Sequence, residues 1–156
     1  MRNLGYTLIE LLVVLGVLAL LATMAVPLAE MTAQREKERE LRRALWEIRD
    51  ALDAYRHART EGALAGDSGG ALYPPTLQTL LVAQPDARVD HRGQIVRFLR
   101  RIPRDPFADP ALPAEQTWGL RSYLSEADAP KAGADVYDVY SKAATLGLNG
   151  VPLSRW

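Results

Sequence analysis

An uncharged apolar run near the start of the chain constrains its fold most. Residues 11–29 consist mainly of Leu, Val and Ala and include no charged side chain. A helix over residues 6–29 would be about 36 Å long, enough to cross the roughly 30 Å hydrocarbon core of a bilayer. A cleaved secretory signal has an apolar stretch of only about 7–15 residues, so the length of the run and the acid at Glu10 argue against that alternative. We expect residues 6–29 to span a membrane once.

The chain after this run is predicted to continue as an amphipathic helix over residues 30–61. Residues 35–40 alternate in charge, and apolar side chains then recur at helical spacing at Leu41, Leu45, Ile48, Leu52 and Tyr55. Pro27 lies inside the predicted helix, where it removes one backbone hydrogen bond and permits a kink. Gly62 and the glycine-rich residues 66–70 are expected to end the helix.

The remaining residues, 62–156, predict a small globular part. Prolines preclude a second long helix, and short helices are expected near residues 75–83 and 93–101. Residues 120–125 and 136–141 have the aromatic and β-branched content of an antiparallel pair of strands, with 127–134 as a loop. The predicted fold class is α+β, with one long N-terminal helix packed on a small antiparallel sheet.

Charge and composition exclude several classes of function. Nineteen Lys and Arg balance nineteen Asp and Glu, and there is no Cys. A nucleic-acid binder is disfavoured, and thiolate metal sites and Cys nucleophiles are excluded. Residues 66–70 (GDSGG) match a serine protease nucleophile motif, but the chain is too short for that fold. His57 and His91 are not expected to bind a metal, because no third ligand is clustered with them. We expect that the chain is not an enzyme, and a membrane-anchored periplasmic enzyme is the alternative. The tryptophans are expected to be core or interface anchors: Trp46, Trp118 and Trp156.

The first residues carry a recognisable motif. Residues 5–10 read GYTLIE, after a short leader with one Arg. This pattern resembles the processing site of the type IV pilin superfamily. The resemblance implies that residues 1–5 are a leader, that a prepilin peptidase cuts after Gly5, and that Tyr6 becomes the N-methylated first residue. It also implies that Glu10 meets the terminal ammonium of a neighbouring subunit, and that Pro27 loosens the helix during assembly.

Later segments are similar to the major pseudopilin of type II secretion systems. They are YPPTLQTL at 73–80, RIPRDPF at 101–107, WGLRSY at 118–123, DVYS at 138–141 and LNGVPL at 148–153. The resemblance implies a subunit that polymerises into a periplasmic pseudopilus and drives export of folded proteins. Its implied partners are further copies, minor pseudopilins, the peptidase, an inner-membrane platform with a cytoplasmic ATPase, and an outer-membrane secretin.

The resemblance also implies an orientation. It places the N-terminus in the cytoplasm and the C-terminal domain in the periplasm. Counting positive charges gives the opposite, because five basic residues follow the span and only Arg2 precedes it. That count has little weight for a large translocated domain, particularly where basic residues alternate with acids.

Two points are left open by the sequence. A type IV pilin of a surface fibre shares the N-terminal motif, although the chain lacks the Cys pair common in pilins. Major pseudopilins usually bind calcium through an acidic C-terminal loop, but residues 141–150 contain no carboxylate. Asp135 and Asp138 are weak calcium candidates, and we expect no cofactor. Packing of Leu146, Leu148 and Trp156 is the expected alternative means of holding this loop.

Overall fold

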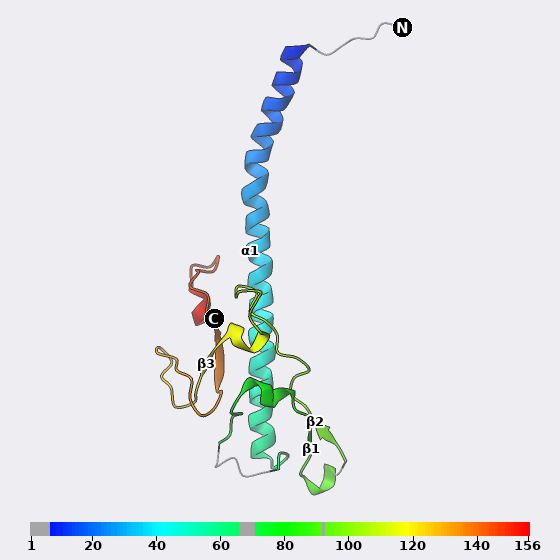
Figure 1. Cartoon of the computed structure of the whole chain (residues 1–156), viewed down its shortest axis with the longest axis vertical. Coiled ribbons are helices and arrows are strands. Elements are labelled where there is room, and N and C mark those ends of the chain that lie inside the picture. The colour runs from blue at the N-terminus through cyan, green and yellow to red at the C-terminus, as the bar shows by residue number, and fades with distance from the viewer. Residues whose placement is uncertain (1–6, 66–70, 92) are drawn as a thin grey trace. The chain divides into compact units, whose positions relative to one another are not determined.

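The computed structural model describes residues 7–65, 71–91 and 93–156. The chain divides into two compact units, Met1–Glu36 and Lys37–Trp156. Helix α1 (Leu8–Thr60) contributes to both units, and the remaining described elements belong to the second (Figure 1). The units are described separately below.

The first unit is built on the N-terminal part of α1. Every described side chain from residue 7 to residue 33 is exposed, including the large apolar ones. By length and composition, α1 is the one helix of the described chain that could cross a membrane. The helix continues through Pro27, so the proline does not end it. Exposed apolar surface of this extent requires lipid or other protein to cover it.

The second unit has its core on one face of α1. The predicted apolar stripe is buried, as are Ala44 and Ala51 beside it: Leu41, Leu45, Ile48, Leu52 and Tyr55. Gly62, with φ of +74°, ends α1 as predicted. The N–H of Gly62 bonds the Arg59 carbonyl at 3.2 Å and that of Ala63 bonds the Ala58 carbonyl at 2.8 Å, the pair of bonds of a Schellman cap.

An antiparallel strand pair packs against this face. Strand β3 (Trp118–Arg121) pairs with β4 (Asp138–Ser141) in the register Trp118↔Ser141 to Arg121↔Asp138. Trp118 and Val139 are fully buried in the core shared with α1. The predicted pairing is confirmed, although β3 begins two residues before the predicted strand and β4 two residues after. The result is the α+β, type IV pilin-like arrangement expected from the sequence.

A second pair of strands replaces a predicted helix. Short 3-10 helix η1 (Leu77–Leu81) lies within the predicted 75–83 helix, but the helix predicted at 93–101 is wrong. Strand β1 (Gln84–Pro85) pairs with β2 (Ile95–Val96) instead. The reason is that backbone groups here find partners in other segments. The N–H of Asp86 bonds the Gln94 carbonyl at 2.9 Å, and the N–H of Leu99 bonds the Leu80 carbonyl at 2.9 Å.

The other described 3-10 helices are η2 (Val89–His91), η3 (Ala114–Thr117) and η4 (Leu153–Arg155). Leu153, at the start of η4, is fully buried in the core. The C-terminal segment therefore returns to the face of α1 and completes the second unit.

Candidate functional site

Glu10 lies in the first turn of α1, directly after the helix start. Its N–H donates to the Thr7 hydroxyl at 3.3 Å, and the N–H of Leu11 donates to the Thr7 carbonyl at 3.2 Å. Thr7 is thus the N-cap and Glu10 the third helical residue, where a carboxylate is favoured by the helix dipole. The spacing Thr-x-x-Glu is that of a capping box. Glu10 is the one side chain between Arg2 and Glu30 that is charged at neutral pH, so it stands alone in an apolar surface.

The other N-terminal residues of the predicted site fall into two groups. Gly5 and Tyr6, the predicted cleavage and methylation site, lie outside the described residues. Pro27 lies inside α1 and has no N–H to donate to the carbonyl four residues earlier, at Thr23. The hydroxyl of Thr23 bonds the Leu20 carbonyl at 2.7 Å, and that of Thr32 bonds the Ala29 carbonyl at 2.8 Å. Such bonds back to the preceding turn accompany helix bending.

The C-terminal loop is held to α1 by polar contacts. The buried carboxylate of Glu38 accepts a 2.7 Å hydrogen bond from the N–H of Leu148. The Arg42 guanidinium lies 4.3 Å from the ring centroid of Trp156. The expected packing of Leu146 and Leu148 is wrong, because these side chains are 60% and 49% exposed. A bridge between Leu146 and Pro152 shapes the loop, which presents its backbone rather than its leucines to α1.

The calcium candidates Asp135 and Asp138 have separate internal partners. Asp135 accepts hydrogen bonds from the Ser122 hydroxyl and from the N–H of Tyr123. Asp138 accepts from Arg49 Nε at 2.8 Å and from its neighbour's N–H at 2.8 Å, and Arg121 lies 3.8 Å from its other oxygen. Within the described ranges, no three His, Cys, Asp or Glu residues gather as a metal site. The carboxylate of Asp138 thus joins α1 to β4.

Hydrogen bonds anchor residues 101–107, which connect the β1–β2 hairpin to β3. Asp105 is buried and accepts the N–H of Phe107 at 2.8 Å through one oxygen and the Ser141 hydroxyl at 2.6 Å through the other. Trp118 Nε1 donates to the Pro103 carbonyl at 2.8 Å. The two prolines of the connector and these bonds fix it against the β3–β4 pair.

An ionic network joins the end of α1 to the β1–β2 hairpin. Arg88 contacts Asp86 at 2.7 Å and Glu61 at 2.8 Å, and Glu61 also contacts His57 at 2.9 Å. The hydrogen bonds from Arg88 lower the pKa of Asp86 to about 2, because they stabilise the charged carboxylate. His91 lies 3.8 Å from Asp86 and 3.1 Å from Gln94. His57 is exposed and His91 is half-buried. Each contacts a different carboxylate, so the two imidazoles do not converge on one site.

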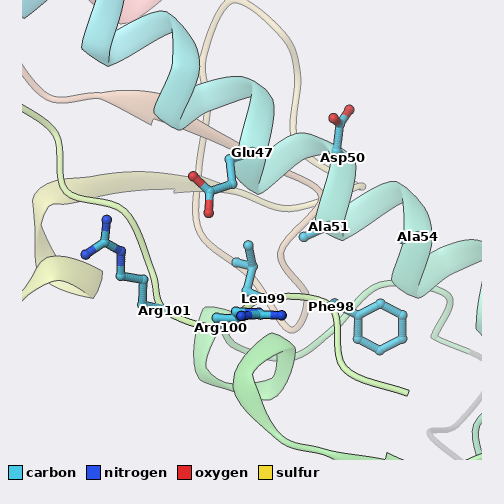
Figure 2. Close-up of a pocket in the computed structure, with 8 residues that line it drawn as sticks. All are labelled: Glu47, Asp50, Ala51, Ala54, Phe98, Leu99, Arg100 and Arg101. Atoms are coloured by element: carbon cyan, nitrogen blue, oxygen red, sulfur yellow. The ribbon is translucent and has the colours of Figure 1, made fainter. Parts of the chain in front are cut away.

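A groove runs between α1 and the loop that follows β2. It has a volume of about 690 Å³ and is lined by Glu47, Asp50, Ala51, Ala54, Phe98, Leu99, Arg100 and Arg101. Figure 2 shows Glu47 pointing from α1 toward the loop, Arg101 rising from the loop toward α1, and the Asp50 carboxylate directed away. Apolar side chains form the floor, and charges of opposite sign stand on the two sides. The groove combines features of a protein-binding surface.

The comparisons with known proteins concern the N-terminus. Residues 1–26 match the family model described as the prokaryotic N-terminal methylation motif. No curated protein and no solved structure matches the chain. The chain therefore carries a type IV pilin-like prepilin signal, which covers Gly5, Tyr6 and Glu10. This signal supports a subunit of the pilin or pseudopilin type.

Sequence reasoning missed several residues of these sites. The capping role of Thr7 was readable from its spacing to Glu10. The burial of Glu38 could not be predicted from the sequence, because this residue lies in an alternating charged stretch typical of a solvated helix face. The sequence left open whether Trp46 lies in the core or at an interface, and the structure places it on the surface with 67% of the residue exposed. Residues 66–70, which carry the protease-like motif, lie outside the described residues.

Proposed function

We propose that this chain is a structural subunit of a type II secretion pseudopilus, and that it acts by assembly rather than by catalysis. The observation that carries the proposal is the position of Glu10. It is a single carboxylate in the first turn of a helix whose N-terminal part exposes its apolar side chains, inside a segment that matches the N-terminal methylation motif. A chain with this pattern needs partners for both the carboxylate and the apolar surface.

Assembly supplies both partners. A charged acid at the centre of a membrane helix costs about 2.5–3.5 kcal/mol, and less near an end. Cleavage after Gly5 would free an ammonium on Tyr6, and this group of one copy would neutralise Glu10 of the next. The exposed apolar parts of α1 from successive copies would cover one another. Such a head-to-tail contact repeats along a helical fibre because it does not close.

The proposed cellular arrangement follows from this assembly. Before assembly, the apolar part of α1 spans the inner membrane once, with the N-terminus cytoplasmic and the second unit periplasmic. A prepilin peptidase would process the leader. An inner-membrane platform with its cytoplasmic ATPase would extract subunits, minor pseudopilins would accompany them, and the growing fibre would move folded proteins through an outer-membrane secretin. The proposed assembly requires no nucleic acid and no cofactor.

The choice of a pseudopilus over a surface pilus rests on the second unit. The sequence segments at 73–80, 101–107 and 118–123 are similar to those of major pseudopilins, and the chain contains no Cys to form the pair common in pilins. The connector and β3 have structural roles in this unit through Pro103, Asp105 and Trp118. A type IV pilin subunit of a surface fibre is the alternative, since it shares the N-terminal signal.

The test is complementation of a deletion strain, with proteins in the culture medium and surface fibres scored in parallel. The strain would receive wild type, Glu10→Ala, Glu10→Asp, or Glu30→Ala as the matched control. We expect deletion to retain secreted enzymes in the periplasm while surface fibres persist. Glu10→Ala should fail to restore export, Glu10→Asp should restore part of it, and Glu30→Ala should restore it fully. Mass spectrometry of the N-terminal peptide should find a methylated Tyr6.

Other outcomes would decide against the proposal. Loss of surface fibres with unchanged export would make the chain a pilin. Full export with Glu10→Ala would remove the role of Glu10 in assembly. An unprocessed N-terminus in an exporting strain would contradict the prepilin pathway.

A further inference from the structure

The face of α1 opposite the core carries an exposed tryptophan flanked by charges. Trp46 is 67% exposed, although burying an indole is strongly favourable. Arg42 precedes it by one helical turn and Asp53 follows it by two, so the three lie along one side of the helix. Exposed Trp with neighbouring Arg is the composition typical of residues that dominate binding at protein interfaces.

The groove beside α1 is chemically complementary to an indole. Its floor of Ala51, Ala54 and Leu99 suits the apolar body of the ring. Glu47 offers a carboxylate to an indole N–H, and the guanidinium of Arg101 can lie over an aromatic face. Neither Glu47 nor Arg101 has a hydrogen-bond or ion-pair partner among the described residues.

The tryptophan and the groove of one chain cannot meet each other. Trp46 and Glu47 are adjacent in α1, so their side chains project about 100° apart around the helix axis. Trp46 is not among the residues that line the groove, and it borders a separate hollow beside Trp156. A second copy can supply the missing half, and its own groove then remains open to a third copy.

We propose that Trp46 of one copy inserts into the groove between α1 and residues 98–101 of the next copy, so that the second units contact one another along the fibre. This contact rests on the proposed function, since the fibre aligns the copies. Arg42 of the first copy would then face Glu47 of the next, and Asp53 would face Arg100. In the described part of the chain, none of these four charges has a salt bridge of its own. The charge pattern selects a second copy as the occupant.

Photo-cross-linking in the full-length chain tests this contact. The chain would carry p-benzoylphenylalanine in place of Trp46, which keeps an aromatic side chain at this exposed position, and would replace wild type in the deletion strain. After illumination of intact cells, we expect multimers at whole multiples of the chain mass. Mass spectrometry should locate the adduct in residues 47–54 or 98–101 of the second copy. The matched control carries the same probe at Leu124, which is 92% exposed, and should give no multimers.

Two further variants separate the contact from the proposed function. Ala54→Trp fills the exposed groove floor and should abolish the cross-link, while Glu10→Ala should abolish it by preventing alignment of the copies. If the strain that carries only the probe at Trp46 exports proteins but gives no cross-link, the contact is overturned and the proposed function stays intact. An adduct with another protein, an adduct between two Trp46 positions, or multimers that survive Glu10→Ala would each overturn it. If export does not require Glu10, the proposed function fails by its own test.

Discussion

The carboxylate of Glu38 on α1 accepts a 2.7 Å hydrogen bond from the backbone of Leu148, 110 residues further along the chain. The bond attaches the C-terminal loop to the helix at a point where the loop's own leucines are exposed. A buried carboxylate that accepts a backbone N–H forms a stronger bond than a neutral pair.

Removing this acceptor should loosen the loop. We expect Glu38→Ala to lower the free energy of unfolding by about 1–2 kcal/mol, because the N–H of Leu148 loses its partner. Glu38→Gln keeps an acceptor oxygen and should cost less. Denaturant unfolding of the detergent-solubilised chain, followed by circular dichroism, measures the difference. Glu40→Ala, on the exposed surface of the same helix, is the control and should leave stability unchanged.

The connector should depend on Asp105. Asp105→Ala leaves both the Ser141 hydroxyl and the Phe107 N–H without their acceptor, and we expect a loss of about 2–3 kcal/mol in unfolding free energy. The same unfolding measurement applies. Asp128→Ala removes an exposed carboxylate and should change stability by less than about 0.5 kcal/mol. Equal effects of the two substitutions would contradict the anchoring role of Asp105.

The Asp86–Arg88 pair predicts an acid-dependent contribution to stability. The pKa of Asp86 falls from 3.8 to about 2 on folding. A lowered folded-state pKa stabilises the fold fully above the unfolded value, and this stabilisation is lost as the pH falls through the folded value. We therefore expect wild type to melt above Asp86→Asn at pH 6, with the gap closing between about pH 4 and pH 2. A gap independent of pH would show that charge on Asp86 is not the cause.

The β3–β4 pair should not accept a side chain at Gly119. A Cβ there would overlap the ring of Tyr140, its cross-strand partner. We expect Gly119→Ala to destabilise the fold by about 1–3 kcal/mol through overpacking. Combining it with Tyr140→Ala should cost less than the sum of the two single changes, because the second substitution removes the overlap. Thermal melting of the four variants forms the double-mutant cycle, and strict additivity would argue against direct contact.

Periodic features of the sequence predicted most of the fold. The stripe from Leu41 to Tyr55 recurs at helical spacing because one face of α1 is buried, and that face is the core. The β3–β4 pair followed from its β-branched and aromatic residues. The helix expected at 93–101 failed because that segment bonds to η1 and β1, and such distant pairing leaves no local pattern.

The site residues also differ in whether a local sequence pattern reveals their role. Glu10 was found because it interrupts an apolar run and follows a recognisable motif. Glu38 and Asp138 were not assigned their partners, because Leu148 and Arg49 approach them only in the folded chain. Asp105 accepts a local bond from the N–H of Phe107, whereas its bond from Ser141 crosses 36 residues and leaves no pattern in the sequence.

The buried position of Leu153 has a consequence for biosynthesis. The stripe on α1 is synthesised early, yet its cover includes a residue made about a hundred residues later. Until then the helix exposes an incomplete core, so the second unit finishes folding only after synthesis has reached Leu153. A chaperone that holds the unfinished chain would have a defined binding surface, the face of α1 around Leu41. Crowding near residues 153–156, such as a bulky fusion, should therefore delay completion of the core.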